Sequence, residues 1–116
     1  MSITRIDMGP RMSQAVVHGS TVYLAGQVAD EPKGKSVTEQ TAQILGQIDR
    51  LLAAAGTDKS KILMATIYLT DIAGFAGMNA AWEPWVAQGN TPARATVEAK
   101  LVAPEYLVEI AVIAAV

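Results

Sequence analysis

The sequence predicts an α+β domain in which two helices pack on one face of a single mixed β-sheet. The first observation is the order of elements, β-β-β-α-β-α-β-β, which follows from the spacing of apolar residues along the chain. The second is a balance of 51% hydrophobic and 17% charged residues, which is sufficient for a packed core. With 116 residues, the chain is expected to form one domain, residues 1–116.

The first third of the chain is predicted to consist of strands. Residues 3–8 alternate loosely between polar and apolar side chains. Residues 15–18 and 21–28 are rich in β-branched and aromatic side chains, and the Gly-Ser pair between them is a hairpin signal. Residues 30–35 contain a proline and a glycine and are expected to form a loop.

A helix is predicted after this loop, and the sequence marks both of its ends. Ser36 or Thr38 can act as the N-cap, because a hydroxyl oxygen accepts a hydrogen bond from a backbone N–H of the first turn. Apolar residues then recur at helical spacing: Ile44, Ile48, Leu51, Leu52 and Ala55. Gly56 stands where a left-handed residue ends a helix.

Four further elements are predicted in the second half of the chain. Residues 64–69 are apolar at nearly every position, which is typical of a strand buried on both faces. Residues 72–89 have helical spacing, and Pro84 within them predicts a kink or a break. Residues 93–101 alternate strictly between apolar and polar side chains, and residues 107–116 form a last, apolar strand. We expect these two strands to pair as a hairpin.

The predicted fold leaves one face of the sheet bare. Both helices lie on the other face, yet the strands near residues 64 and 112 are apolar on both faces. A large exposed apolar face is typical of an association surface. At ~25 cal/mol per Å², covering it stabilises each chain by on the order of several kcal/mol. We therefore expect a symmetric homo-oligomer that buries the bare face.

Composition and charge exclude several classes of function. Cysteine is absent and His18 is the only histidine, which excludes a thiolate nucleophile and a cysteine–zinc site. A net charge of −2 without a basic stripe argues against nucleic acid, and the lysines in segments 33–35 and 59–61 are typical of solvated loops. No apolar run approaches the ~20 residues of a membrane span. A cytoplasmic location away from membranes is expected.

Two charged residues stand out from their surroundings. Arg94 lies near the start of a strand, and its planar fork of N–H donors suits a carboxylate held by two hydrogen bonds. The structural alternative is that Arg94 forms an ion pair with Glu98 or Glu109 and binds no ligand. Glu109 is the lone charge in an apolar strand, where a carboxylate suits proton transfer or the orientation of water. A residue at the rim that reaches solvent is the alternative.

Strand register decides whether Arg94 and Glu109 share a face, and the sequence leaves register open. Matching the apolar faces of the two strands places Glu109 opposite the polar side of the Arg94 strand. A bulge, or a site built between chains, relieves this conflict. Asn79 on the second helix and Gly26 are further candidates, since glycine lets a backbone approach a ligand closely. A core position and a strand-end bulge are their structural alternatives.

Five segments together carry a family resemblance: YLAGQV at 23–28, LLAAAG at 51–56, IYLTDIAGFAGMNAAWEPW at 67–85, PARATVEA at 92–99 and VEIAVIAA at 108–115. In this order they resemble the YjgF/RidA family of enamine and imine deaminases, also labelled L-PSP endoribonucleases. PAR followed by VEI is the most specific part. The resemblance implies a chorismate-mutase-like fold and a homotrimer with ligand clefts between neighbouring chains.

The resemblance also implies roles for individual residues, without a metal or a cofactor. Arg94 of the PAR motif would hold the substrate carboxylate, and Glu109 would position or activate the attacking water. Asn79 would line the cleft, and Gly26 would approach the ligand through its backbone. The backbone at Thr96 would also contact the carboxylate.

The sequence departs from the family pattern at the substrate end. Ala25 stands where a serine is usual, and Met12 lies in the stretch where a tyrosine is usual, so that Met12 is a candidate substrate-binding residue. These departures indicate a divergent side branch that keeps the carboxylate anchor and differs in substrate.

The activity implied is hydrolytic deamination of 2-enamine and 2-imino acids to 2-keto acids and ammonia, of the 2-iminobutanoate/2-iminopropanoate deaminase type in metabolite damage control. A non-catalytic or regulatory trimer that binds small carboxylates is the alternative, which the two missing hydroxyls favour. RNA cleavage rests on the old family label, and the acidic charge balance and the lone His18 argue against it.

Overall fold

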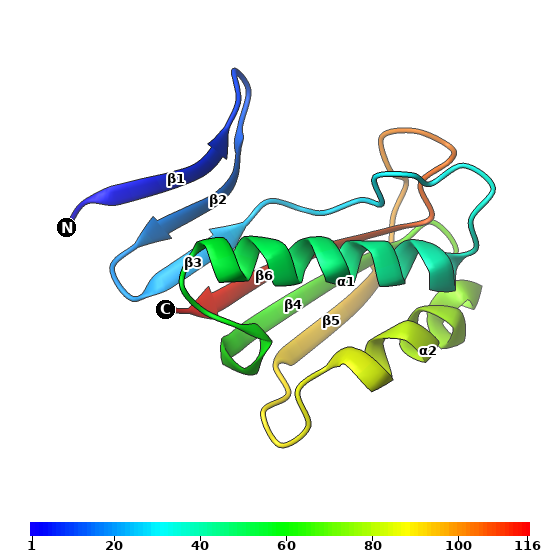
Figure 1. Cartoon of the computed structure of the whole chain (residues 1–116). Coiled ribbons are helices and arrows are strands. Elements are labelled where there is room, and N and C mark those ends of the chain that lie inside the picture. Colours follow the sequence, from blue (N-terminus) through cyan, green and yellow to red (C-terminus); the bar gives the residue numbers. More distant parts are fainter.

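A six-stranded sheet with strand order β1-β2-β3-β6-β4-β5 is the main layer of the computed structural model, which describes residues 1–116 (Figure 1). Strands β4 and β5 are parallel, and all other neighbours are antiparallel. Helices α1 and α2 contact each other and lie on one face of the sheet, which confirms the predicted α+β architecture. None of the helices combines the length and the apolarity needed to cross a bilayer. The elements are β1 Ile3–Met8, β2 Ser13–His18, β3 Thr21–Leu24, α1 Val37–Ala54, β4 Ile62–Leu69, α2 Phe75–Trp85, β5 Ala93–Glu98 and β6 Val108–Ala115.

Helix α1 begins and ends where the sequence predicts. The Ser36 hydroxyl accepts a hydrogen bond from the Glu39 backbone N–H at 3.1 Å, and the Glu39 carboxylate accepts one from the Ser36 N–H at 2.9 Å. The bond from the Ser36 backbone lowers the pKa of Glu39, because it favours the charged carboxylate. Thr38, the other predicted cap, instead donates to the Gly77 carbonyl of α2. Gly56, with φ of 82°, follows the helix in the left-handed conformation.

The predicted hairpin between the last two strands is wrong. Strand β5 pairs only with β4, and β6 lies between β3 and β4. The nearly continuous apolar sequence of β4 explains this arrangement, because a strand covered by neighbours on both edges and by helices on one face has few polar positions. The half-polar β5 is left at the edge of the sheet. Residues 99–107 cross the end of β4 to join β5 to β6 (Figure 1).

Several predicted elements are shorter in the structure. Helix α2 ends one residue after Pro84, so that the proline marks the end of the helix and not a kink within it. A 3-10 turn, Ile72–Gly74, precedes α2. Strand β5 stops at Glu98, and β3 stops at Leu24. Beyond β3, only Gln27 bridges to β6.

The two faces of the sheet differ in their cover. The helix-covered face carries side chains of β4 and β6 that are at most 1% exposed: Ala65, Ile67, Leu69, Val108, Ile110 and Val112. On the opposite face, Tyr23, Val97 and Ile113 are 48%, 43% and 36% exposed, although they are large and apolar. The chain therefore has the bare apolar face that the sequence predicts.

Candidate active site

Arg94 projects from β5 toward helix α2. It pairs in register with Ala65, which is fully buried beneath the helices, so both side chains lie on the helix-covered face. The guanidinium Nη1 donates to Asn79 Oδ1 at 2.7 Å. Its Cζ lies 5.2 Å from the ring centroid of Trp82 and 5.6 Å from that of Phe75. Two residues named from the sequence, Arg94 and Asn79, are therefore in direct contact.

The guanidinium has only neutral partners in this arrangement. The ion pair with Glu98, one structural alternative, is not the contact observed, because Glu98 Oε1 accepts from the Ile72 backbone N–H at 2.9 Å. Glu109, the other alternative, projects from the opposite face of the sheet. Within the chain, the Arg94 guanidinium makes a single hydrogen bond, to Asn79. Most of its N–H donors therefore remain available to an anion.

Glu109 lies on the bare face, directly opposite Tyr68 of the neighbouring strand β4. Both residues line a depression of about 350 Å³ together with Gly26 and Ala111. Residues 99–102, which follow β5, form its remaining wall. Glu109 is half-buried in this hollow, and Lys100 is the one other charged residue in its lining. Such surroundings suit a group that positions water or transfers a proton.

Gly26 is required by its contact with Glu109. A Cβ atom at position 26 would overlap Glu109 Oε2 and lie 2.9 Å from its Cδ, so the carboxylate occupies the space that a side chain would fill. The neighbouring amides of Ala25 and Gln27 donate to Gln14 O and Ile110 O, whereas the Gly26 N–H has no such backbone bond. The structure thus joins Gly26 and Glu109, a second pair of residues named from the sequence.

The two pairs do not form one site within a chain. Arg94 and Asn79 lie on the helix-covered face of β5, whereas Glu109 and Gly26 lie on the bare face of β6, with β4 in between. The conflict of faces expected from the alternating pattern is therefore present, and no bulge at β5 relieves it.

Thr96 and Met12 lie apart from these contacts. Thr96 shares the helix-covered face with Arg94, two positions along β5, and its Oγ1 is buried without a hydrogen-bond partner. Met12 is 49% exposed and lines a separate depression of about 380 Å³ with Asp7, residues 9–11 and Gln14.

Replacing Thr96 by valine is expected to raise the free energy of unfolding by about 1 kcal/mol, because it removes an unpaired buried hydroxyl and keeps the shape of the side chain. Denaturant unfolding measures this difference. Substrate binding is expected to persist, since the role implied for residue 96 belongs to its backbone. A loss of stability would mean that the hydroxyl has a partner in the assembled protein.

Sequence reasoning missed the residues around each pair. Tyr68 and residues 100–102 line the Glu109 hollow, and Phe75 packs on the Arg94 guanidinium. Tyr68 could have been found once β4 was placed beside β6, because the register then puts it opposite Glu109. The chain brings together no group of three or more histidine, aspartate or glutamate side chains able to hold a metal ion.

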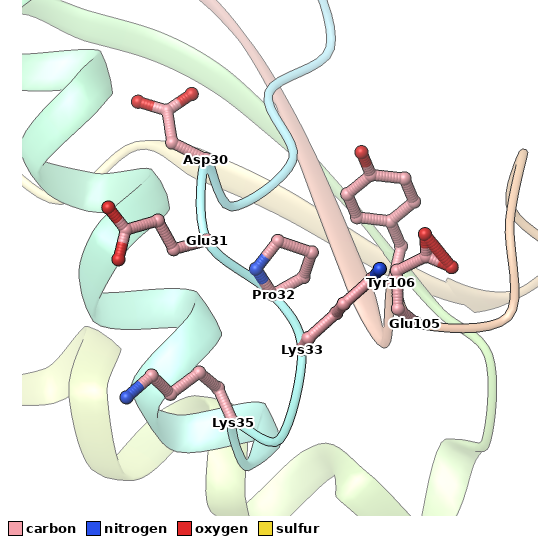
Figure 2. A pocket seen from close by; sticks show the side chains of 7 residues that line it. All are labelled: Asp30, Glu31, Pro32, Lys33, Lys35, Glu105 and Tyr106. Atoms are coloured by element: carbon pink, nitrogen blue, oxygen red, sulfur yellow. The ribbon is translucent and has the colours of Figure 1, made fainter.

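A larger cavity, of about 550 Å³, lies between the loop before α1 and the segment before β6 (Figure 2). Three carboxylates and two lysines line it with Pro32 and Tyr106: Asp30, Glu31, Glu105, Lys33 and Lys35. It contains neither Arg94 nor Glu109, and its mixture of charges selects no ligand class.

Comparison with known proteins identifies the family. Residues 3–116 match the family model described as Endoribonuclease L-PSP. The RutC family protein YoaB of Escherichia coli is 47% identical over 116 residues, which cover 100% of both chains. A RutC family protein of Haemophilus ducreyi is 46% identical over 114 residues, covering 98% of this chain and 97% of the relative.

A solved structure extends the likeness to three dimensions. A member of the YjgF protein family from Neisseria meningitidis superposes with a TM-score of 0.96 at 47% identity, covering 99% of this chain and 95% of that one. The chain belongs to the YjgF/RutC family, also called L-PSP, and has the YjgF-like α+β fold that the sequence segments implied.

Proposed function

We propose that this protein is a hydrolase that deaminates 2-enamine and 2-imino acids to 2-keto acids and ammonia. The observation that carries the proposal is the half-buried Arg94 guanidinium, whose partners are an amide and two aromatic rings, all of them neutral. A cation in such surroundings favours an anionic ligand, and its unused donors suit a carboxylate. A 2-imino acid carries that carboxylate next to the carbon that reacts.

In the proposed reaction, an enamine tautomerises to the imine while Arg94 holds the carboxylate. Glu109 accepts a proton from water as the water oxygen attacks the imine carbon. The proton passes to the nitrogen, which gives a carbinolamine. A second proton then moves from the hydroxyl through Glu109 to the nitrogen, the C–N bond breaks, and ammonia leaves the 2-keto acid. One water is consumed per turnover, and Glu109 returns to its starting state.

The opposite orientation of Arg94 and Glu109 supports a homotrimer with clefts between neighbouring chains. In such an assembly, Arg94 of one chain would meet Glu109 of the next. The exposed Tyr23, Val97 and Ile113 would be covered at the same time. Light scattering at micromolar concentration tests this assembly, and a monodisperse monomer would contradict it.

A trapping assay tests the activity. Imino acids are generated in situ with an amino-acid oxidase or a serine dehydratase, and semicarbazide traps those that remain. The wild-type protein is expected to lower the rate of trapping, because it hydrolyses the imine first. An unchanged rate across a panel of side chains would refute the deaminase proposal.

The second candidate is a non-catalytic trimer that binds small carboxylates. Ala25 and Met12 favour it, because neither supplies a hydroxyl at the substrate end. Titration with a 2-keto acid separates the two candidates. Saturable binding by a protein that leaves the trapping rate unchanged would support the binding protein, and a lowered trapping rate would exclude it.

A further inference from the structure

Three glutamines of α1 hold the segment between β3 and α1 in place. Residues 25–36 form no strand beyond the single Gln27–Ile110 bridge, so their backbone groups need partners elsewhere. Gln40, Gln43 and Gln47 share one side of the helix at spacings of three and four. Gln40 donates to the carbonyls of this segment near its C-terminal end, and Gln43 both donates to and accepts from the backbone of Glu31.

Gln47 differs from the other two glutamines because it bonds a side chain as well as backbone. Only 6% of it is exposed. Its Oε1 accepts from the Asp30 N–H at 3.1 Å, and its Nε2 donates to the Val28 carbonyl at 2.9 Å and to Gln27 Oε1 at 3.3 Å. An amide is suited to this place, since it donates and accepts without burying a charge.

Gln27 links Gln47 to the backbone around Gly26. Its Nε2 donates to the Ala25 carbonyl and to Gln14 Oε1, each at 3.0 Å. Its backbone N–H donates to Ile110 O at 2.8 Å, and its carbonyl accepts from the Ile110 N–H at 3.0 Å. Gly26 is thus fixed through the residues on both of its sides, at the point where its Cα faces the carboxylate of Glu109.

We propose that Gln47 is a positioning residue for the active site, which acts through Gln27 to hold the Gly26 backbone against the Glu109 carboxylate. The inference rests on the proposed function, because its consequence for the reaction is the placement of the general base. Neither amide touches the substrate. A shift of the Gly26 segment would move Glu109 into or out of line with the attacking water.

We call the path from Gln47 through Gln27 to Gly26 the relay. Replacement of Gln47 by methionine tests it, because methionine keeps the length of the side chain and removes all three hydrogen bonds. We expect kcat to fall roughly tenfold or more, with KM changed less than about twofold, since the carboxylate anchor is untouched. Gln43→Met is the matched control: the same helix loses two bonds to the same segment, at Glu31, and kcat is expected to stay unchanged. Assays run well below the melting temperature of each variant.

A second variant and a second measurement separate the possible failures. Gln27→Met should also lower kcat, and the double variant should lose no more than the worse single variant, since both act on one path. Hydrogen–deuterium exchange of the Gln27 backbone amide can be measured without turnover. Its rate should become roughly tenfold faster in Gln47→Met, but not in Gln43→Met.

The outcomes separate the relay from the proposed function. Unchanged kcat in Gln47→Met, with active wild type, would overturn the relay alone. Inactive wild type would refute the deaminase proposal, and the exchange rates would still decide whether Gln47 holds the segment. If Gln43→Met and Gln47→Met lowered kcat equally, both glutamines would only stabilise the segment, and the positioning role of Gln47 would be refuted.

Discussion

Replacing Arg94 by alanine is expected to raise KM for an imino acid, and Kd for a 2-keto acid, by at least roughly 100-fold. Each of the two charged hydrogen bonds from the fork to a carboxylate contributes about 1.5–3 kcal/mol, and each 1.4 kcal/mol is a factor of ten in affinity. The loss should be severe because the side chains that contact the guanidinium are all neutral. None of them carries a positive charge that could bind the carboxylate in place of Arg94. Trapping kinetics and calorimetric titration measure the two constants.

Two further variants interpret that result. Arg94→Lys keeps the positive charge and loses the planar fork, so its KM should lie between those of wild type and Arg94→Ala. Arg50→Ala removes an exposed arginine from α1 and should leave KM unchanged. If Arg94→Ala bound a 2-keto acid as tightly as wild type, the carboxylate anchor would lie elsewhere and the proposed function would lose its main support.

The sequence predicts where the helices and strands lie better than it predicts which strands pair. Helix α1 carries local signals at both ends, the Ser36 cap and Gly56, and both operate in the structure. The pairing of β6 is decided by contacts far apart in sequence, for which the chain offers no local signal. The five residues between the two predicted strands, 102–106, favour a hairpin, yet the apolar β4 takes the position between β5 and β6, where neighbours cover both of its edges.

Candidate site residues could be picked from the sequence one at a time, but their contacts with one another could not. The contact between Arg94 and Asn79 depends on how α2 crosses β5, and that of Gly26 with Glu109 depends on the single Gln27 bridge. Neither follows from spacing along the chain. The alternation of β5 separates Arg94 from Val97, but it does not say which side faces the helices, and the structure places Arg94 on the helix-covered face and Val97 on the bare face.

Replacing Glu109 by glutamine is expected to lower kcat by roughly 100- to 10,000-fold, the usual contribution of a general base, while KM changes little. The amide has nearly the shape of the carboxylate, so it still fits against Gly26, but it does not accept a proton from water. Glu98→Gln is the matched control, because that carboxylate accepts from the Ile72 backbone and does not line the hollow. A kcat unchanged in Glu109→Gln would remove Glu109 from the mechanism.

Mixing the two impaired variants, assayed at substrate concentrations far below the raised KM of Arg94→Ala, decides whether the site is shared between chains. A site built from Arg94 of one chain and Glu109 of its neighbour is intact only where the Glu109→Gln chain supplies the arginine and the Arg94→Ala chain supplies the glutamate. After co-refolding in equal amounts, roughly a quarter of the sites meet both conditions, so about a quarter of wild-type kcat should return. If both residues came from the same chain, no mixture would restore activity, because every chain lacks one of them. Recovered trapping activity therefore distinguishes a cleft between chains from a site within one, which is the arrangement that the opposite faces of Arg94 and Glu109 favour.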